Sequence, residues 1–277
     1  MMLINGVATN ELLATDRAVQ YGDGLFETIA IFKGEPRAWH RHMRRLFSGC
    51  AKLGIPQPDT TLLEAEVRQL YKDCGQGQER LVLKIIISRG SGGRGYRPDT
   101  KSLPATPTRI LSLYPWPEHT YEWYNLGVRL HICETRLSCN PALAGVKHLN
   151  RIENILASSE WQDNDVAEGL MCNMEGDVIE GTMTNIFAVV DGGLQTPMLK
   201  QCGISGTMRA RVIEAAVELG IGVDECRMSL DELYKADEVF VCNSIINIVP
   251  VRQLGIHMYA VPGPIMNRLA TVTRDRE

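Results

Sequence analysis

The strongest constraint on the fold is the order in which strand-like and helix-like segments follow one another. Residues 24–32 (GLFETIAIF) and 81–88 (LVLKIIIS) are rich in β-branched and aromatic residues and have the length of strands. Between them, residues 39–53 and 60–73 repeat apolar side chains at helical spacing. The first half of the chain therefore predicts a sheet covered by helices.

The second half shows the same mixture of strands and helices. Strand signals lie at residues 128–133, 169–173, 185–190 and 238–243. Residues 205–220 (SGTMRARVIEAAVELG) predict a helix with Ser205 as its N-cap, an apolar stripe and a closing glycine. The pattern predicts a second α+β unit.

A boundary between the two halves is predicted where a strand signal at residues 108–114 ends. The following sequence, PWPEH, contains two prolines, which interrupt regular structure. For a chain of 277 residues, two domains are the expected number. We predict a small N-terminal α+β domain at residues 1–114, a linker at 115–122 and a larger C-terminal α+β domain at 123–277.

Composition excludes several classes of function. A hydrophobic share of 44% and a charged share of 22% describe a globular protein without the long apolar run of a membrane span. The net charge of −4 gives no indication of a nucleic-acid partner. The start of the chain lacks a basic segment followed by a long apolar stretch, so we expect a cytoplasmic protein. Eight cysteines form no CxxC pair, and no metal site is predicted.

Three short segments carry residues suited to chemistry, and each has a structural alternative. Residues 89–96 (RGSGGRGY) combine backbone freedom with two guanidinium groups, which suits a carboxylate or phosphate, but they could equally form a surface loop. Residues 22–24 (GDG) could be a turn before a strand. Lys147 ends the apolar run LAGV, where a neutral amine would be a nucleophile; alone, it is more often a surface lysine.

The joint order of seven motifs changes these interpretations. The motifs are YGDGLFET (21–28), HMRRL (42–46), SRGSGGRGY (88–96), GVKHLNR (145–151), EGTMTNIF (180–187), GISGTMR (203–209) and CNSIINIVPV (242–251). Together they resemble the fold-type IV pyridoxal-phosphate enzymes, which include branched-chain and D-amino-acid transaminases and aminodeoxychorismate lyases. GGRGY and KHLNR are most similar to the lyases. The resemblance extends from about Asn5 to Val251.

This resemblance implies a two-domain fold with pyridoxal 5'-phosphate between the domains. Lys147 then holds the cofactor as a Schiff base and acts as the base that moves protons beside it. Glu180 matches the family's acid at the pyridinium nitrogen, which must stay protonated to act as an electron sink.

The resemblance also assigns residues to the cofactor phosphate. Arg45 matches the family's phosphate arginine, and Thr207 and Met208 offer N–H groups at the start of the predicted helix. Ser244 matches a hydroxyl position that reaches phosphate in relatives. Other arginines near these motifs are expected to be solvated charges on helix faces: Arg41, Arg44 and Arg209.

For the substrate, Arg94 and Tyr96 align with the carboxylate-binding pair of D-amino-acid transaminases, and Tyr21 lines the pocket. Thr28 matches a threonine of the lyases and is expected to aid proton transfer. The implied reaction converts 4-amino-4-deoxychorismate to 4-aminobenzoate, a folate precursor, and pyruvate. A transaminase of the same fold, or a phosphate-binding protein without activity, are the alternatives. Family members are usually homodimers, and we expect the same here.

Overall fold

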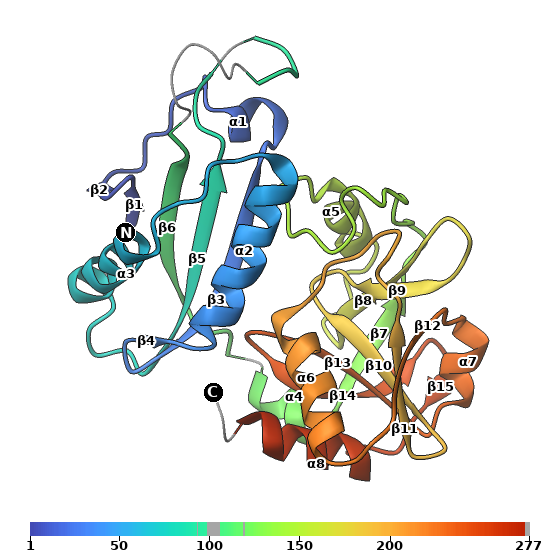
Figure 1. The fold of residues 1–277 in the computed structure, drawn as a ribbon. Helices are drawn as coiled ribbons and strands as arrows, with labels where there is room; N and C mark the ends of the chain where they lie inside the picture. The colour runs from blue at the N-terminus through green and yellow to red at the C-terminus, as the bar shows by residue number, and fades with distance from the viewer. Residues whose placement is uncertain (93, 99–105, 119, 275–277) are drawn as a thin grey trace. The chain divides into compact units, whose positions relative to one another are not determined.

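The computed structural model describes residues 1–92, 94–98, 106–118 and 120–274, and the chain divides into two compact units (Figure 1). The first unit comprises Met1–Trp116 and Val146–Asn150, and the second comprises Pro117–Gly145 and Arg151–Glu277. The five residues around Lys147 thus belong to the first unit, although the chain on either side of them belongs to the second. The domain boundaries that we placed at residues 114 and 123 remain a prediction.

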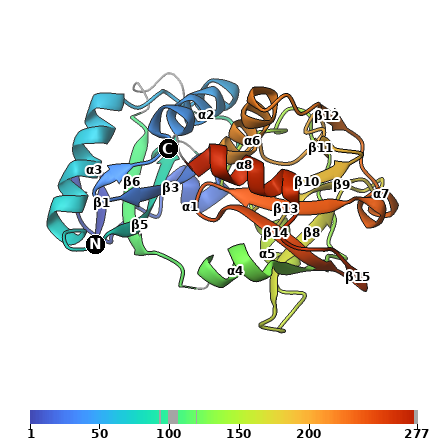
Figure 2. The same ribbon diagram turned by 90° about the horizontal axis from the view of Figure 1, so that it is seen from below.

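The first unit is built on a six-stranded antiparallel sheet in the order β2-β1-β6-β5-β3-β4. Its elements are β1 (Met2–Ile4), β2 (Val7–Ala8), α1 (Arg17–Tyr21), β3 (Gly24–Phe32), β4 (Glu35–Pro36), α2 (Trp39–Leu53), α3 (Thr60–Cys74), β5 (Arg80–Ser88) and β6 (Thr108–Pro115). Helices α2 and α3 lie on the same face of this sheet (Figures 1 and 2).

The apolar spacing in the sequence explains this layer of helices. Alternate residues of β3, including Leu25 and Ile29, are buried together with Met43 and Leu46 of α2 in one core. Helix α3 begins after Asp59, whose carboxylate accepts the N–H of the second helical residue at 2.8 Å. Each helix therefore buries one stripe against the sheet.

The second unit contains a nine-stranded mixed sheet in the order β12-β11-β10-β13-β14-β7-β8-β9, with β15 paired to β14. Its strands are β7 (Val128–Ile132), β8 (Val166–Cys172), β9 (Val178–Gly181), β10 (Asn185–Val190), β11 (Gly193–Pro197), β12 (Val223–Cys226), β13 (Glu238–Asn243), β14 (Asn247–Leu254) and β15 (His257–Met258). Its helices are α4 (Thr120–Leu126), α5 (Ile152–Ser158), α6 (Thr207–Glu218), α7 (Leu230–Lys235) and α8 (Pro264–Arg274).

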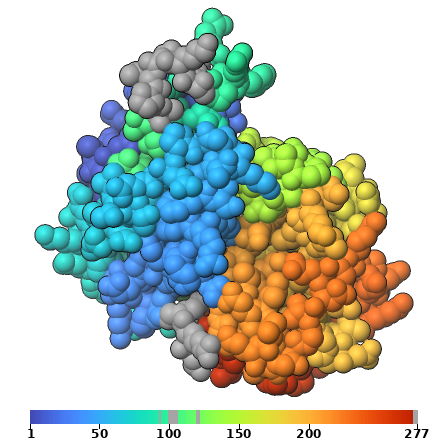
Figure 3. All heavy atoms as spheres, viewed as in Figure 1, coloured from blue at the N-terminus to red at the C-terminus, as the bar shows by residue number. Residues whose placement is uncertain are grey.

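Both faces of this sheet are buried, because successive residues of β10 belong to different cores. Phe187 packs with α6 and α8, and its ring stacks on Phe240 at a centroid distance of 5.1 Å. Ile186 faces the other core, which includes Leu233 of α7. Helices α6 and α8 lie on one side of the sheet and α4 on the other (Figure 2). In the space-filling view, orange atoms of the segment that contains α6 lie on the visible face of the second unit (Figure 3).

The structure corrects the predicted start of the helix at residues 205–220. Helix α6 begins at Thr207, and Gly206, not Ser205, is its N-cap. Ser205 instead follows Ile204, which forms a parallel β-bridge with Gly145. The main-chain N–H of Ser205 donates to the Gly145 carbonyl at 3.2 Å. This pairing keeps Ser205 outside the helix.

Other predicted elements agree with the structure to within a few residues. The strands at residues 24–32, 185–190 and 238–243 and the helix at 39–53 have the predicted bounds. The strand signal at residues 169–173 is the end of the longer β8. Among the described residues, no helix combines the length and the apolar character needed to cross a membrane.

Candidate active site

Lys147 lies beside the edge of β3 in the first unit. The main-chain N–H of Phe26 donates to the carbonyl of Lys147 at 3.1 Å, and Leu25 and His148 form an antiparallel bridge. In this register the Lys147 side chain shares a face of β3 with Phe26, and its Nζ lies 4.2 Å from the Phe26 ring centroid. Thr28 lies on the same face two residues later. The partly buried Lys147 amine and the Thr28 hydroxyl thus lie on the same face of β3.

The other face of β3 carries a buried charged cluster that the sequence analysis did not identify. Glu27 is 1% exposed, and its Oε2 lies 2.6 Å from Nδ1 of His42. Arg45 of α2 donates from Nε to Oε1 at 2.9 Å and from Nη2 to Oε2 at 2.5 Å. The predicted phosphate arginine is therefore held in a bidentate ion pair. In the sequence, the indication of this cluster was the acid Glu27, which occupies a position of β3 where the alternation predicts a buried apolar residue.

The charges in this cluster follow from its burial and its partners. Burial raises the pKa of Glu27, but the Arg45 guanidinium and the hydrogen bonds of Arg45 and His42 outweigh it and bring the pKa to about 2. Burial lowers the pKa of His42, and the positive charges of Arg45 and Lys147 lower it further. The hydrogen bond and negative charge of Glu27 raise this pKa but do not outweigh the other effects. At neutral pH, Glu27 is a carboxylate and His42 a neutral ring.

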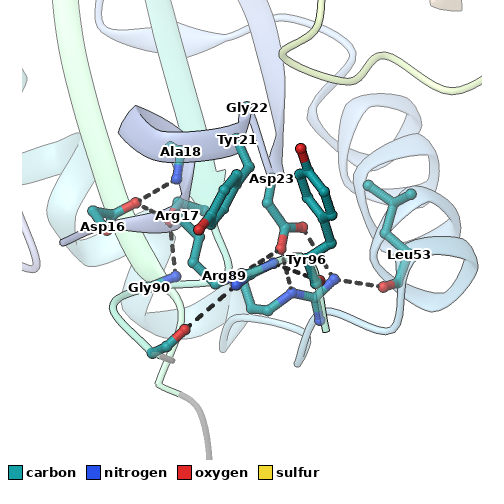
Figure 4. A network of polar contacts seen from close by, with 12 residues as sticks. Asp16, Arg17, Ala18, Tyr21, Gly22, Asp23, Leu53, Arg89, Gly90 and Tyr96 are labelled. Atoms are coloured by element: carbon teal, nitrogen blue, oxygen red, sulfur yellow. Dashed lines mark hydrogen bonds and ion pairs between the residues drawn. The ribbon is translucent and has the colours of Figure 1, made fainter. Parts of the chain in front are cut away.

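Two of the predicted substrate residues, Tyr21 and Tyr96, lie together at the end of α1 (Figure 4). The Tyr21 and Tyr96 rings meet edge to face with centroids 5.6 Å apart, and Tyr21 accepts the N–H of Gly95 at 3.1 Å. Arg94 is exposed in the same loop. Arg89, the other arginine of the motif, does not share this exposure, because it donates to Asp23 at 2.7 and 3.0 Å.

Residues 22–24 are more than a turn before a strand. Gly22 has a φ of +63°, and a Cβ at this position would lie 2.7 Å from Oδ1 of Asn150. The Asn150 amide in turn donates to the Gly22 carbonyl at 3.0 Å. This close approach fixes the segment that carries Lys147 against the start of β3.

Glu180 lies in β9 of the second unit and is 2% exposed. Its Oε2 accepts the main-chain N–H of Ile204 at 2.7 Å. Gly203 has a φ of +85°, and a Cβ there would lie 2.7 Å from Leu199 and 2.8 Å from Ile179. Only glycine allows the chain to approach the Glu180 carboxylate in this way.

The first turn of α6 offers N–H groups as an anion site. Gly206 has no side chain to cap them, and a Cβ at this position would lie 2.0 Å from Oδ1 of Asn185. Thr207 and Met208 follow as the first buried residues of the helix. Ser244 lies in the turn between β13 and β14, in which Asn243 accepts the N–H of the residues two and three positions later at 2.8 and 2.9 Å.

Glu168 of β8 holds the loop between β9 and β10, and the sequence analysis missed it. This buried carboxylate accepts the N–H groups of Thr182 at 3.0 Å and Met183 at 3.1 Å, and the hydroxyl of Thr184 at 2.9 Å. Burial raises its pKa against these hydrogen bonds. In the sequence, the indication was again an acidic residue, Glu168, within an otherwise apolar strand.

One expectation about arginines was wrong. Arg209 of α6 is 6% exposed and donates to the carbonyl of Pro197 at 3.0 Å and to Glu225 at 2.7 Å. The helix packs this side of its first turn against β11 and β12, so the guanidinium is buried. Arg44 is exposed, as expected.

Among the described residues, His131, Cys133 and Glu160 place one potential metal-binding atom each within 4.8 Å of the others. Glu160 already accepts the N–H groups of Glu134 at 2.7 Å and Thr135 at 2.8 Å. Burial, followed by nearby acids, raises the pKa of Cys133 to about 12, so the thiol keeps its proton. These contacts describe a partly exposed turn held by the Glu160 carboxylate, and we assign no metal to it.

Comparison with known proteins defines the class. Residues 24–254 match the family model of the class IV aminotransferases. The fold and these motifs define a fold-type IV pyridoxal-phosphate enzyme, and the chain belongs to the class IV aminotransferase family. The predicted fold class and cofactor are confirmed.

Relatives named for the lyase match this chain over almost its whole length. An aminodeoxychorismate lyase of Vibrio harveyi is 38% identical over 96% of this chain and 95% of its own. The crystal structure of 4-amino-4-deoxychorismate lyase from Pseudomonas aeruginosa is 43% identical with a TM-score of 0.92, covering 99% of this chain and 98% of its own. The Escherichia coli branched-chain amino acid aminotransferase is 25% identical with a TM-score of 0.87, covering 99% and 93%.

The residues of each unit fit the chemistry of pyridoxal phosphate. The first unit supplies Lys147, a primary amine beside an aromatic ring. The second supplies the buried carboxylate of Glu180 and the helix N-terminus at Gly206, which suit a protonated pyridine nitrogen and a phosphate dianion.

Proposed function

We propose that this protein is a pyridoxal-phosphate-dependent lyase that converts 4-amino-4-deoxychorismate to 4-aminobenzoate and pyruvate. The observation that carries the proposal is the 43% identity to the Pseudomonas aeruginosa lyase across nearly the full length of both chains, against 25% to the branched-chain transaminase. The reaction breaks a carbon–oxygen bond and leaves an aromatic ring, so it needs no keto acid acceptor. We further propose a cytoplasmic homodimer.

In the first unit, Lys147 would hold the cofactor covalently and, once freed, remove the ring proton of the substrate. When bound, pyridoxal phosphate supplies an electron sink for the resulting negative charge. Thr28, on the same strand face, would relay the proton that Lys147 has taken up to the departing enolpyruvate. Arg45 would donate to the cofactor phosphate while Glu27 fixes the plane of its guanidinium.

In the second unit, Glu180 would keep the pyridine nitrogen protonated, and the N–H of Ile204 fixes the orientation of its carboxylate. The N–H groups at Thr207 and Met208 and the hydroxyl of Ser244 would bind the phosphate. Arg94 and Tyr96, beside Tyr21 in the first unit, would bind a substrate carboxylate.

Incubation of the purified holoenzyme with 4-amino-4-deoxychorismate tests the proposal. Pyruvate and 4-aminobenzoate should form in equal amounts without added keto acid. Amino transfer from D-alanine or leucine to 2-oxoglutarate, without pyruvate release, would identify a transaminase of the same fold. A purified protein without the visible absorption of bound pyridoxal phosphate, even after addition of the cofactor, would contradict the whole class.

A further inference from the structure

Arg17 of α1 has no role in the function proposed above, yet it is among the most buried arginines described. It is 3% exposed. Its guanidinium donates to main-chain carbonyls of one loop: Nη1 to Gly95 at 3.0 Å, Nη2 to Tyr96 at 3.0 Å, and Nη1 more weakly to Gly92 at 3.4 Å. The loop itself is exposed, with Tyr96 87% exposed. A buried guanidinium thus holds the backbone of an otherwise solvated segment.

The Arg17 side chain is itself fixed from the opposite side. Its Nε donates to Asp23 at 2.8 Å, and Arg89 donates to the same carboxylate at 2.7 and 3.0 Å. Arg89 also donates to the carbonyls of Leu53 at 2.7 Å and Gly54 at 2.6 Å, where α2 ends. Burial raises the pKa of Asp23, but the two guanidinium groups outweigh it and lower the pKa below its usual range. This charged network therefore persists at neutral pH.

Tyr21 completes the connection to the proposed substrate residues. The Arg17 guanidinium carbon lies 4.7 Å from the Tyr21 ring centroid, and the Tyr21 hydroxyl accepts the Gly95 N–H at 3.1 Å. Figure 4 shows the Tyr21 and Tyr96 rings on the same side of the network. Arg94 lies within the short stretch whose carbonyls Arg17 binds. One guanidinium thus contacts the Tyr21 ring and the backbone carbonyls on both sides of Arg94.

We infer that Arg17 is a positioning residue for substrate carboxylate binding. It acts through the loop backbone, and the inference rests on the proposed roles of Arg94 and Tyr96. A loop held in place before binding loses less conformational entropy when the substrate binds. A planar guanidinium can bind separate carbonyls at fixed angles, whereas an ammonium on a flexible stem cannot. Arg17→Lys keeps the charge beside Asp23 and removes this geometry.

The test compares Arg17→Lys with Arg109→Lys in the holoenzyme. Arg109 is a matched control because it is also a largely buried arginine of the first unit, ion-paired to Glu66 at 2.7 Å. For Arg17→Lys, KM for aminodeoxychorismate should rise about tenfold while kcat stays within about threefold, the size expected for a weakened charge-assisted contact. The visible absorption of the cofactor should be unchanged. Arg109→Lys should leave KM unchanged.

Two further readouts do not depend on turnover. Trypsin cleavage after Arg94, followed by mass spectrometry, should be about tenfold faster in Arg17→Lys, because local opening exposes a loop to proteases. Chorismate has both carboxylates of the proposed substrate and a hydroxyl in place of its amine, and its calorimetric Kd should rise in parallel with KM. If Arg17→Lys fails to fold, Asp23→Asn should show the same changes at about threefold, since it weakens the hold on Arg17.

Equal KM, Kd and cleavage rates in Arg17→Lys and Arg109→Lys would overturn the inference. Faster cleavage of Arg17→Lys with an unchanged KM for aminodeoxychorismate and an unchanged Kd for chorismate would also overturn it. If the wild-type enzyme released no pyruvate, that result would contradict the proposed function but not the inference about Arg17. The cleavage rates and the chorismate affinity would then still decide whether Arg17 positions a carboxylate-binding loop.

Discussion

At the scale of single residues, the role of Lys147 depends on where its amine lies. The Nζ is close to the Phe26 ring, on the face of β3 that also carries Thr28. Lys147→Ala should give a folded protein that binds pyridoxal phosphate only noncovalently and does not turn over. Borohydride reduction of the wild type followed by peptide mapping should place the cofactor on Lys147. Labelling of Lys84 or Lys200 instead would contradict the assignment.

Glu180→Gln tests the electron sink at the same scale. The variant should keep the covalently bound cofactor but turn over at least about tenfold more slowly, because an amide cannot hold the pyridine nitrogen protonated as a carboxylate does. The Ile204 N–H can still donate to the amide oxygen, so the fold should be retained. Steady-state kinetics and the visible spectrum measure the two effects separately. Wild-type turnover would show that Glu180 has only a structural role.

The variant Thr28→Val distinguishes a catalytic role of the Thr28 hydroxyl from a role in the packing of β3. If this hydroxyl delivers a proton, Thr28→Val should slow formation of pyruvate and 4-aminobenzoate by about 10²-fold with an unchanged cofactor spectrum. Valine keeps the branched shape, so stability should change little. A variant with normal rates would assign Thr28 to the packing of the strand.

Glu27 links one buried residue to the pH dependence of stability. Its carboxyl has a pKa of about 2 when folded and about 4.5 when unfolded, so in acid the unfolded chain takes up the proton first. The stabilisation, on the order of 3 kcal/mol, is therefore complete above about pH 5 and is lost as the pH falls towards 2. Denaturant unfolding should show a smaller loss of stability over this range in Glu27→Gln than in wild type. The exposed Glu175→Gln serves as a control and should follow wild type.

At the scale of elements, the start of α6 requires a glycine. A Cβ at Gly206 would lie 2.0 Å from Asn185 Oδ1, so Gly206→Ala must displace the asparagine that binds the Ile204 carbonyl. We expect a loss of about 1–3 kcal/mol in unfolding free energy. The same displacement moves the first N–H groups of the helix, so affinity of the apoprotein for pyridoxal phosphate should fall about tenfold.

The matched control for this element is Gly222→Ala. A Cβ at Gly222 would meet no atom within 4 Å, and its φ is not positive. This variant should keep wild-type stability and cofactor affinity in urea unfolding and absorbance titrations. Equal behaviour of the two alanine variants would show that the close approach at Gly206 does not determine the phosphate site.

At the scale of the whole molecule, the proposed homodimer makes a prediction about a surface. Ile152, Ile155 and Leu156 of α5 are 63%, 58% and 55% exposed. Apolar side chains grouped on one short helix are typical of a protein interface. Sedimentation should give about twice the 30.8 kDa chain mass, and Ile155→Glu with Leu156→Glu should shift the protein towards monomer. A dimer unaffected by both changes would place the interface elsewhere.

Local sequence determined most of the elements, because helix and strand periodicities follow from side chains a few positions apart. The motif order also determined the family and its cofactor, and it identified Lys147 and Glu180 as candidate residues. The local helix pattern misassigned Ser205 as an N-cap and Arg209 as a solvated charge, since the partners that decide both, Gly145 and Glu225, are distant in sequence.

Only the tertiary structure decided which polar groups are buried together. Glu27 becomes the partner of Arg45 because β3 packs on α2, and Glu168 holds the β9–β10 loop because β8 pairs with β9. Arg17 reaches the carbonyls of residues more than 70 positions away, a relation that no local spacing encodes. Burial makes such pairs necessary, because an isolated charge in the interior is too costly. The sequence thus determined which chemical groups are present, and the packing of distant segments decided which of them act together.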